Sequence, residues 1–75
     1  MNNIRRRAIS AAWKAIDAAR AELEQVRDEE QEYYDNMPEA FQQGDKGAMA
    51  EAAIEALDAA ITACEDATSA LDEVG

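Results

Sequence analysis

The sequence has no histidine and only one cysteine among its 75 residues. Without histidine, the chain cannot build a Ser-His-Asp triad, a histidine-ligated metal site or an imidazole general base. Cys64 has no partner for an intrachain disulfide, and no basic residue close to it in the sequence would activate it as a nucleophile. We therefore expect a protein that is not an enzyme and that holds neither a metal nor a cofactor.

Residues that interrupt helices are also few, namely three glycines and one proline. Pro38, Gly44 and Gly47 fall in one short window, whereas eighteen alanines and many Glu, Leu and Arg residues favour helix elsewhere. The sequence predicts one all-α domain over residues 1–75: a helix over about 3–35, a short helical connector over about 36–45 and a helix over about 46–73. We expect the two long helices to form an antiparallel hairpin. Asn36 or Met37 should cap the connector helix, and Asp45 should cap the last helix.

Apolar residues recur at alternating steps of three and four, which is the spacing of a coiled-coil seam. The stripe of the first helix is Ile9, Ala12, Ile16, Ala19, Leu23, Val26, Glu30, Tyr33 and Met37. The last helix carries two adjacent stripes, Ala53, Leu57, Ala60, Cys64, Ala67, Leu71 and Val74 beside Ala50, Ile54, Leu57, Ile61, Cys64 and Thr68. Because one neighbouring helix cannot cover so wide a face, we expect a four-helix bundle or a larger oligomer. The large side chains expected at the oligomer interface are Trp13, Ile16, Leu23, Ile54, Leu57, Ile61 and Leu71.

The chain is poor in positive charge, with 7 Lys+Arg against 17 Asp+Glu and a net charge of −10. This charge repels nucleic acids and anionic membranes, and no apolar run is long enough to cross a bilayer. We expect no direct nucleic-acid binding and no membrane association. Residues 1–27 hold six basic and three acidic side chains, whereas residues 28–75 hold one basic and fourteen acidic ones. Antiparallel folding should bring the arginines at 5–7 near Asp66, Asp72 and Glu73.

Three of the four aromatic residues gather near the connector, together with cations and an amide. The candidates for binding a partner or ligand are Arg27, Glu30, Tyr33, Tyr34, Asn36, Phe41 and Lys46. Aromatic rings beside Arg and Asn are typical of a protein-binding hot spot or of a pocket that stacks a nucleobase, although the same rings would also serve to close the end of a hairpin. Glu30 interrupts the apolar stripe, and Arg27 or Lys46 should supply the charge that a buried carboxylate needs. Glu30 then either fixes the register of the helices or takes part in binding a partner.

Residues 26–39 read V-R-D-E-E-Q-E-Y-Y-D-N-M-P-E and precede Gln42, Gly44 and an acidic helix rich in Ala and Leu. This stretch resembles a group of small acidic proteins encoded by bacteriophages and prophages, which carry an RDEEQEAFDNLPE-like signature before a second helix. The resemblance covers nearly all of the chain from about Leu23 onward. It differs at Tyr33 and Tyr34, which replace Ala-Phe, and at Met37, which replaces Leu. The resemblance implies a phage setting and attaches no enzymatic activity.

A phage setting favours a self-associated binding protein whose target is a host protein, one that belongs to the bacterium's defence against phages. The chain would neutralise this target by occlusion, in the cytoplasm of the infected bacterium. One alternative is an oligomer that sequesters a nucleotide immune signal, with Tyr33 or Tyr34 stacking on the base and Arg27 or Lys46 binding the phosphate. A DNA mimic and a structural assembly protein are further alternatives.

Overall fold

The computed structural model describes residues 1–74, and it contains helices and no strand among those residues. This confirms the all-α prediction. Helix α1 spans Asn3–Asp35, helix α2 spans Glu39–Gln42 and helix α3 spans Asp45–Asp72. Asn2 caps α1, because its side-chain Oδ1 accepts a hydrogen bond of 2.8 Å from the backbone N–H of Arg5.

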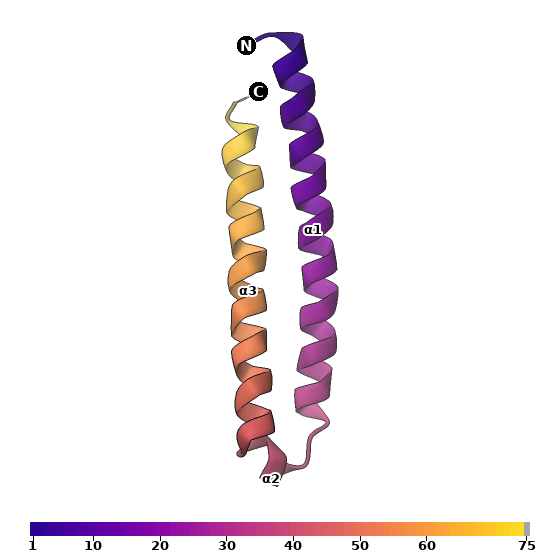
Figure 1. Ribbon diagram of the computed structural model, residues 1–75, viewed down its shortest axis with the longest axis vertical. Helices are drawn as coiled ribbons and strands as arrows, with labels where there is room; N and C mark the ends of the chain where they lie inside the picture. The colour runs from indigo at the N-terminus through magenta and orange to yellow at the C-terminus, as the bar shows by residue number, and fades with distance from the viewer. Residues whose placement is uncertain (75) are drawn as a thin grey trace.

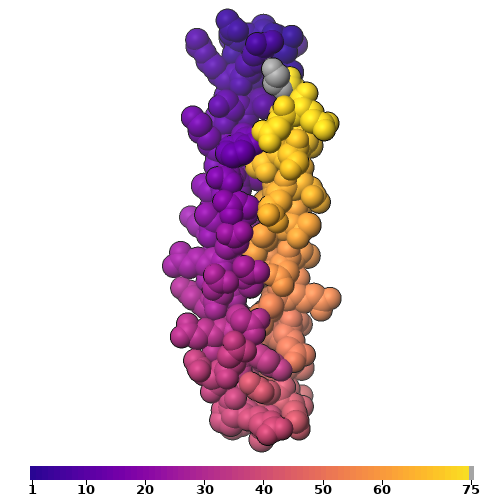
Figure 2. Space-filling model, turned by 180° about the vertical axis from the view of Figure 1, so that it is seen from behind, coloured from indigo at the N-terminus to yellow at the C-terminus, as the bar shows by residue number. Residues whose placement is uncertain are grey.

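The two long helices lie side by side and run in opposite directions, with α2 at one end and both chain termini at the other (Figure 1). The result is a narrow rod whose Cα atoms extend 58 × 14 × 13 Å (Figure 2). Its radius of gyration is 17.1 Å, whereas a compact chain of this length has about 11 Å. A pair of helices this long and thin has little interior.

The side of α1 that packs on α3 differs from the predicted stripe at every second position. Half-buried residues recur at Ile9, Trp13, Ile16, Arg20, Leu23, Arg27, Glu30 and Tyr34, while Ala12, Ala19, Val26 and Tyr33 are exposed. The prediction was therefore wrong by one residue at these four positions. Trp13 and Tyr34 bury more area than an alanine does, and the arginines lay their aliphatic stems along the seam. The indole Nε1 of Trp13 is buried and has no hydrogen-bond partner among the described residues.

On α3 the packed side is the second predicted stripe, flanked by half-buried Ala53, Ala60 and Ala67. The core between the helices is thin. Among residues 1–74, the buried hydrophobic side chains are Ala50, with 2% of its surface exposed, and Ile61, with 6%. The seven large residues expected at an oligomer interface are half-buried or buried on the sides of α1 and α3 that pack together, so they already serve the contact within one chain.

The connector is fixed by a close contact between α2 and the first turn of α3. Pro38 rather than Asn36 or Met37 is the N-cap of α2, and Gly44 rather than Asp45 is the N-cap of α3, neither with a side-chain cap. Asp45 lies within the first turn, where its carboxylate favours the helix dipole. Gly47 is buried, and a Cβ built on it would lie 1.9 Å from the carbonyl oxygen of Gln42. Glycine at this position therefore lets the two backbones touch.

Candidate functional site

The two flanks of the seam differ sharply in chemistry. Residues spaced by seven along a helix stay on one side of it, so each flank can be followed along both helices. One flank consists of Ser10, Asp17, Glu24 and Gln31 of α1 with Glu51, Asp58, Glu65 and Asp72 of α3; we call this the polar face. The other consists of Ala12, Ala19, Val26 and Tyr33 of α1 with Met49, Ala53, Ala60, Ala67 and Val74; we call this the apolar face, and the same spacing adds one cation at the start of each helix, Arg5 and Lys46. The rod is therefore amphipathic as a whole.

Two surface hollows, each lined by residues of both helices, show which flank of α1 lies beside which flank of α3. Gln31 and Tyr34 line one hollow with Glu51 and Asp58 on the polar side. Tyr33 lines another hollow with Met49 and Ala53 on the apolar side. The two neighbouring tyrosines thus belong to opposite faces.

Arg27 joins the helices across the polar face. Its Nη1 donates to Asp58 Oδ1 at 2.7 Å and its Nε to Asp28 Oδ1 at 2.9 Å. The pKa of Arg27 is raised, first because its guanidinium donates to Asp58 and then because it donates to Asp28. Both partners are exposed, so this pair orients the helices more than it stabilises them.

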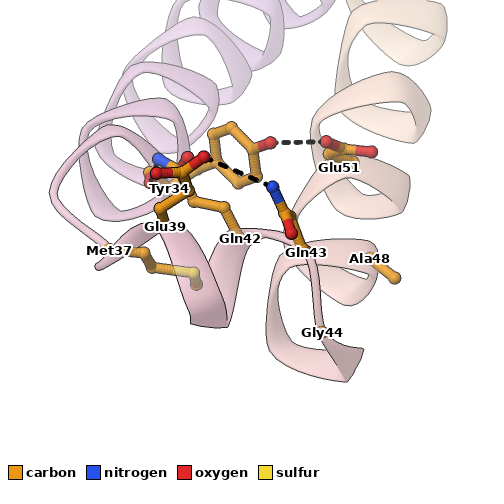
Figure 3. A pocket seen from close by; sticks show the side chains of 8 residues that line it. All are labelled: Tyr34, Met37, Glu39, Gln42, Gln43, Gly44, Ala48 and Glu51. Carbon is orange, nitrogen blue, oxygen red and sulfur yellow. Dashed lines mark hydrogen bonds between the residues drawn. The ribbon is translucent and has the colours of Figure 1, made fainter.

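Tyr34 makes the second polar link between the helices. Its hydroxyl donates to Glu51 Oε1 at 2.6 Å, and the side-chain amide of Gln42 donates to the carbonyl oxygen of Tyr34 at 2.9 Å (Figure 3). The hydrogen bond to Glu51 is the main cause of a raised Tyr34 pKa, followed by burial and by the charges of Glu51 and Asp35. These residues line an open hollow beside the connector, to which Glu39 and Gln43 also contribute. Tyr34 therefore has a structural role that ties α1, α2 and α3 together.

Four of the predicted binding residues line a separate hollow on the other side of the connector: Tyr33, Asn36, Phe41 and Lys46. The ammonium Nζ of Lys46 lies 5.6 Å from the centre of the Phe41 ring, within the range of a cation–π contact. Tyr33 and Phe41 are each 53% exposed. This hollow offers two aromatic surfaces and one cation to a partner.

The remaining predicted residues do not join that hollow. Arg27 is engaged by Asp28 and Asp58, and Tyr34 by Glu51. Glu30 is half-buried and lines a hollow with Lys46, yet among residues 1–74 it forms no ion pair with Lys46 or Arg27 within 4 Å. The predicted cluster therefore divides into a structural group around Tyr34 and an exposed group around Tyr33.

The structure brings Arg6 and Asp72 to one surface hollow, as antiparallel folding predicts, but the N-terminal arginines are not neutralised by an ion pair within the described residues. Within residues 1–74, Arg5, Arg6 and Arg7 form no salt bridge, although α3 ends at the same end of the rod as they do (Figure 1). The arginine that does pair along α1 is Arg20, which contacts Asp17 at 3.0 Å and Glu24 at 2.8 Å and has a raised pKa because it donates to them. Three cations are thus left for other partners.

The acidic partners of Arg27 and Tyr34 on the polar face were not predicted from the sequence. Asp58 and Glu51 are acidic residues on the flank of α3, and nothing in the local sequence distinguishes them from other carboxylates. The spacing by seven between them was available as a signal, because it places both on one side of the helix.

The described part of the chain contains no group of three carboxylate or thiol side chains arranged to hold a metal ion. No helix within residues 1–74 is long and apolar enough to cross a membrane. Comparison with known protein families, curated proteins and solved structures found no match.

Proposed function

We propose that this chain is a non-catalytic binding protein: a helical hairpin that assembles into a homo-oligomeric bundle and blocks a basic surface of another protein by covering it. The observation that supports this most directly is the division of the rod into an apolar face and a carboxylate-lined polar face. The apolar face serves self-association. The polar face stays in water and faces the partner.

Electrostatics supports a basic partner. The net charge of −10 attracts a positively charged surface over a long range. Glu65 and Asp72 on the polar face are exposed, and their side chains take part in no salt bridge within residues 1–74. These two carboxylates are available to pair with lysines or arginines of a target.

The resemblance of residues 26–39 to phage-encoded proteins supports a target in the defence machinery of a bacterial host. In this proposal the chain acts in the cytoplasm of the infected cell, where it occupies the target and keeps the target's own ligand out. A DNA mimic would act in the same way on a DNA-binding target.

The test is retention of bacterial proteins on the immobilised chain, compared between two matched double variants. E65K/D72K reverses two charges on the polar face, and D66K/E73K reverses the two neighbouring charges on the side of α3 that points away from α1. We expect a basic protein that the wild type and D66K/E73K retain and that E65K/D72K loses. Equal retention by both variants would contradict binding through the polar face.

A nucleotide-sequestering oligomer is a second candidate, supported by the aromatic and cationic hollow of Tyr33, Phe41 and Lys46. A thermal shift with nucleotides that is lost in Lys46→Ala would support it. The high negative charge of the chain weighs against it, because each phosphate would have to be held by few cations.

A further inference from the structure

A single copy of the chain leaves too much of its surface uncovered for its size. It exposes 5489 Å², whereas a compact protein of 8.2 kDa exposes about 4,500 Å². The excess of about 1,000 Å² is comparable to the roughly 800 Å² that each partner buries in a stable interface of standard size. The area that a dimer needs is therefore present on each copy.

The surface that fits such an interface is the apolar face. Its larger members are well exposed: Val26 by 48%, Tyr33 by 53%, Met49 by 73% and Val74 by 44%. The alanines between them permit close approach of a second helix. The polar face offers no comparable apolar area, because its residues are charged or polar and several already pair with Arg20, Arg27 or Tyr34.

We propose that a second copy of this chain covers the apolar face, with the two rods running in opposite directions about a two-fold axis near Ala19. The inference rests on the homo-oligomer of the proposed function and specifies its interface. α1 of one copy packs on α1 of the other along its length, and α3 packs on α3 over residues 60–72, because Ala19 is level with residue 66 in the register that the Arg27–Asp58 and Tyr34–Glu51 contacts set. Met49 lies outside this four-helix overlap.

Charge selects this orientation over one that places like ends together. Residues 20–61, the connector half of the rod, contain three basic and twelve acidic side chains. The terminal half, residues 1–19 with 62–75, contains four basic and five acidic ones. If the two rods ran in the same direction, two connector halves, each with a net charge of −9, would lie side by side. Opposite ends place each connector half against a nearly neutral half that carries the three arginines.

Side-chain size selects the same orientation. On the apolar flank of α1, Arg5, Ala12, Ala19, Val26 and Tyr33 are spaced evenly about Ala19. A two-fold axis at Ala19 places Val26 opposite Ala12 of the partner subunit, so a large residue packs on a small one. It also places Tyr33 and the nearby Glu29 at the level of Arg5 of the partner subunit. Arg5 then gains the ring and carboxylate that it lacks within one chain.

Two neighbouring alanines of α1 provide a matched test of the interface. Ala18 and Ala19 are both exposed, but Ala19 belongs to the apolar face and Ala18 lies on the side of α1 that points away from α3. Ala19→Glu brings two carboxylates together at the two-fold axis, so we expect the dimer dissociation constant to rise by at least about 100-fold. Ala18→Glu, with the same change in charge, should leave it within a few-fold of wild type. Equal effects of the two substitutions would overturn the assignment of the interface.

The orientation is tested by a distance that does not depend on a disruptive substitution. A spin label is attached to the cysteine of the variant Ile4→Cys, in which Cys64→Ser removes the native thiol. Residue 4 suits a label because Ile4 is 76% exposed. Opposite rods with an axis near Ala19 place the two labels about 45 Å apart, since residue 4 lies fifteen residues from the axis. Like ends together would give about 20 Å, the diagonal of a four-helix bundle. The shorter distance, or the absence of dipolar coupling at a concentration where wild type is fully associated, overturns the proposal.

The label distance and the binding assay report on different faces of the rod. If the labels lie at the shorter distance and E65K/D72K still loses the basic partner, the antiparallel dimer is refuted and binding through the polar face is supported. If the labels lie at the longer distance and the chain retains no protein, the antiparallel dimer is supported and binding through the polar face is refuted.

Discussion

At the scale of single residues, Gly47 has a role that its backbone conformation does not reveal. A Cβ on Gly47 would meet the carbonyl oxygen, the carbonyl carbon and the Cα of Gln42 at 1.9, 2.4 and 2.6 Å. All three are backbone atoms, so no side-chain rotation relieves the contact. A Cβ on Gly44 would meet its nearest atom, the carbonyl oxygen of Ala40, at 3.4 Å.

We predict that Gly47→Ala destabilises the chain by about 1–3 kcal/mol, because α2 has to move away from α3. Gly44→Ala is the matched control, and we expect a change within about 0.5 kcal/mol. Urea denaturation followed by circular dichroism measures both at one protein concentration. Similar losses in the two variants would mean that the contact with Gln42 is not what requires glycine at position 47.

Tyr34 gives a prediction for high pH. Its hydroxyl donates to Glu51, which raises its pKa above 10.0 in the folded chain. The folded state therefore holds this proton more tightly than the unfolded state. The stability linked to it is fully present below pH 10 and is lost as pH rises through the raised value.

Tyr33→Phe leaves Tyr34 as the one tyrosine of the chain, so its ionisation can be followed by ultraviolet absorbance. We expect an apparent pKa above 10.0. Removing the acceptor with Glu51→Ala in the same background should lower that pKa. If the pKa does not change, the contact between Tyr34 and Glu51 is absent in solution.

At the scale of elements, the pairing of α1 and α3 depends on few buried side chains. Ile61 is 6% exposed, whereas Ile4 on α1 is 76% exposed. We predict that Ile61→Ala lowers the free energy of unfolding by about 2–5 kcal/mol, and that Ile4→Ala changes it by at most about 0.5 kcal/mol. Thermal unfolding at a fixed concentration compares the two variants. An equal effect would indicate that the seam is not the stabilising contact.

The extent of the helices followed from the sequence, because alanine-rich stretches and three clustered breakers leave little choice. The packed side of α3 was also accessible from spacing alone. The packed side of α1 was not, since Ala12 and Trp13 both fit a helical period and only the opposing helix decides between them. The same limit applied at the connector, where adjacent Tyr33 and Tyr34 suggested one cluster but face opposite sides of the rod.

At the scale of the whole molecule, the two faces of the rod assign two tasks to a chain of 75 residues. Within one copy, the core between α1 and α3 is thin, because Ala50 and Ile61 are its buried hydrophobic side chains among residues 1–74. Burying the apolar faces of two copies against each other adds a second hydrophobic layer. The same arrangement turns the two polar faces outward on opposite sides of the bundle. We predict that a dimer therefore binds two copies of its basic partner, which the mass of the complex measures. A complex of one partner per dimer would contradict two independent polar faces.

One copy of the chain is incomplete in this proposal, because its apolar face needs a second copy to cover it. Sedimentation equilibrium of the wild-type chain at micromolar concentration measures whether the second copy is there. We expect a species of two chains, with twice the 8.2 kDa mass of one copy. A folded, helical species with the mass of a single chain would contradict it.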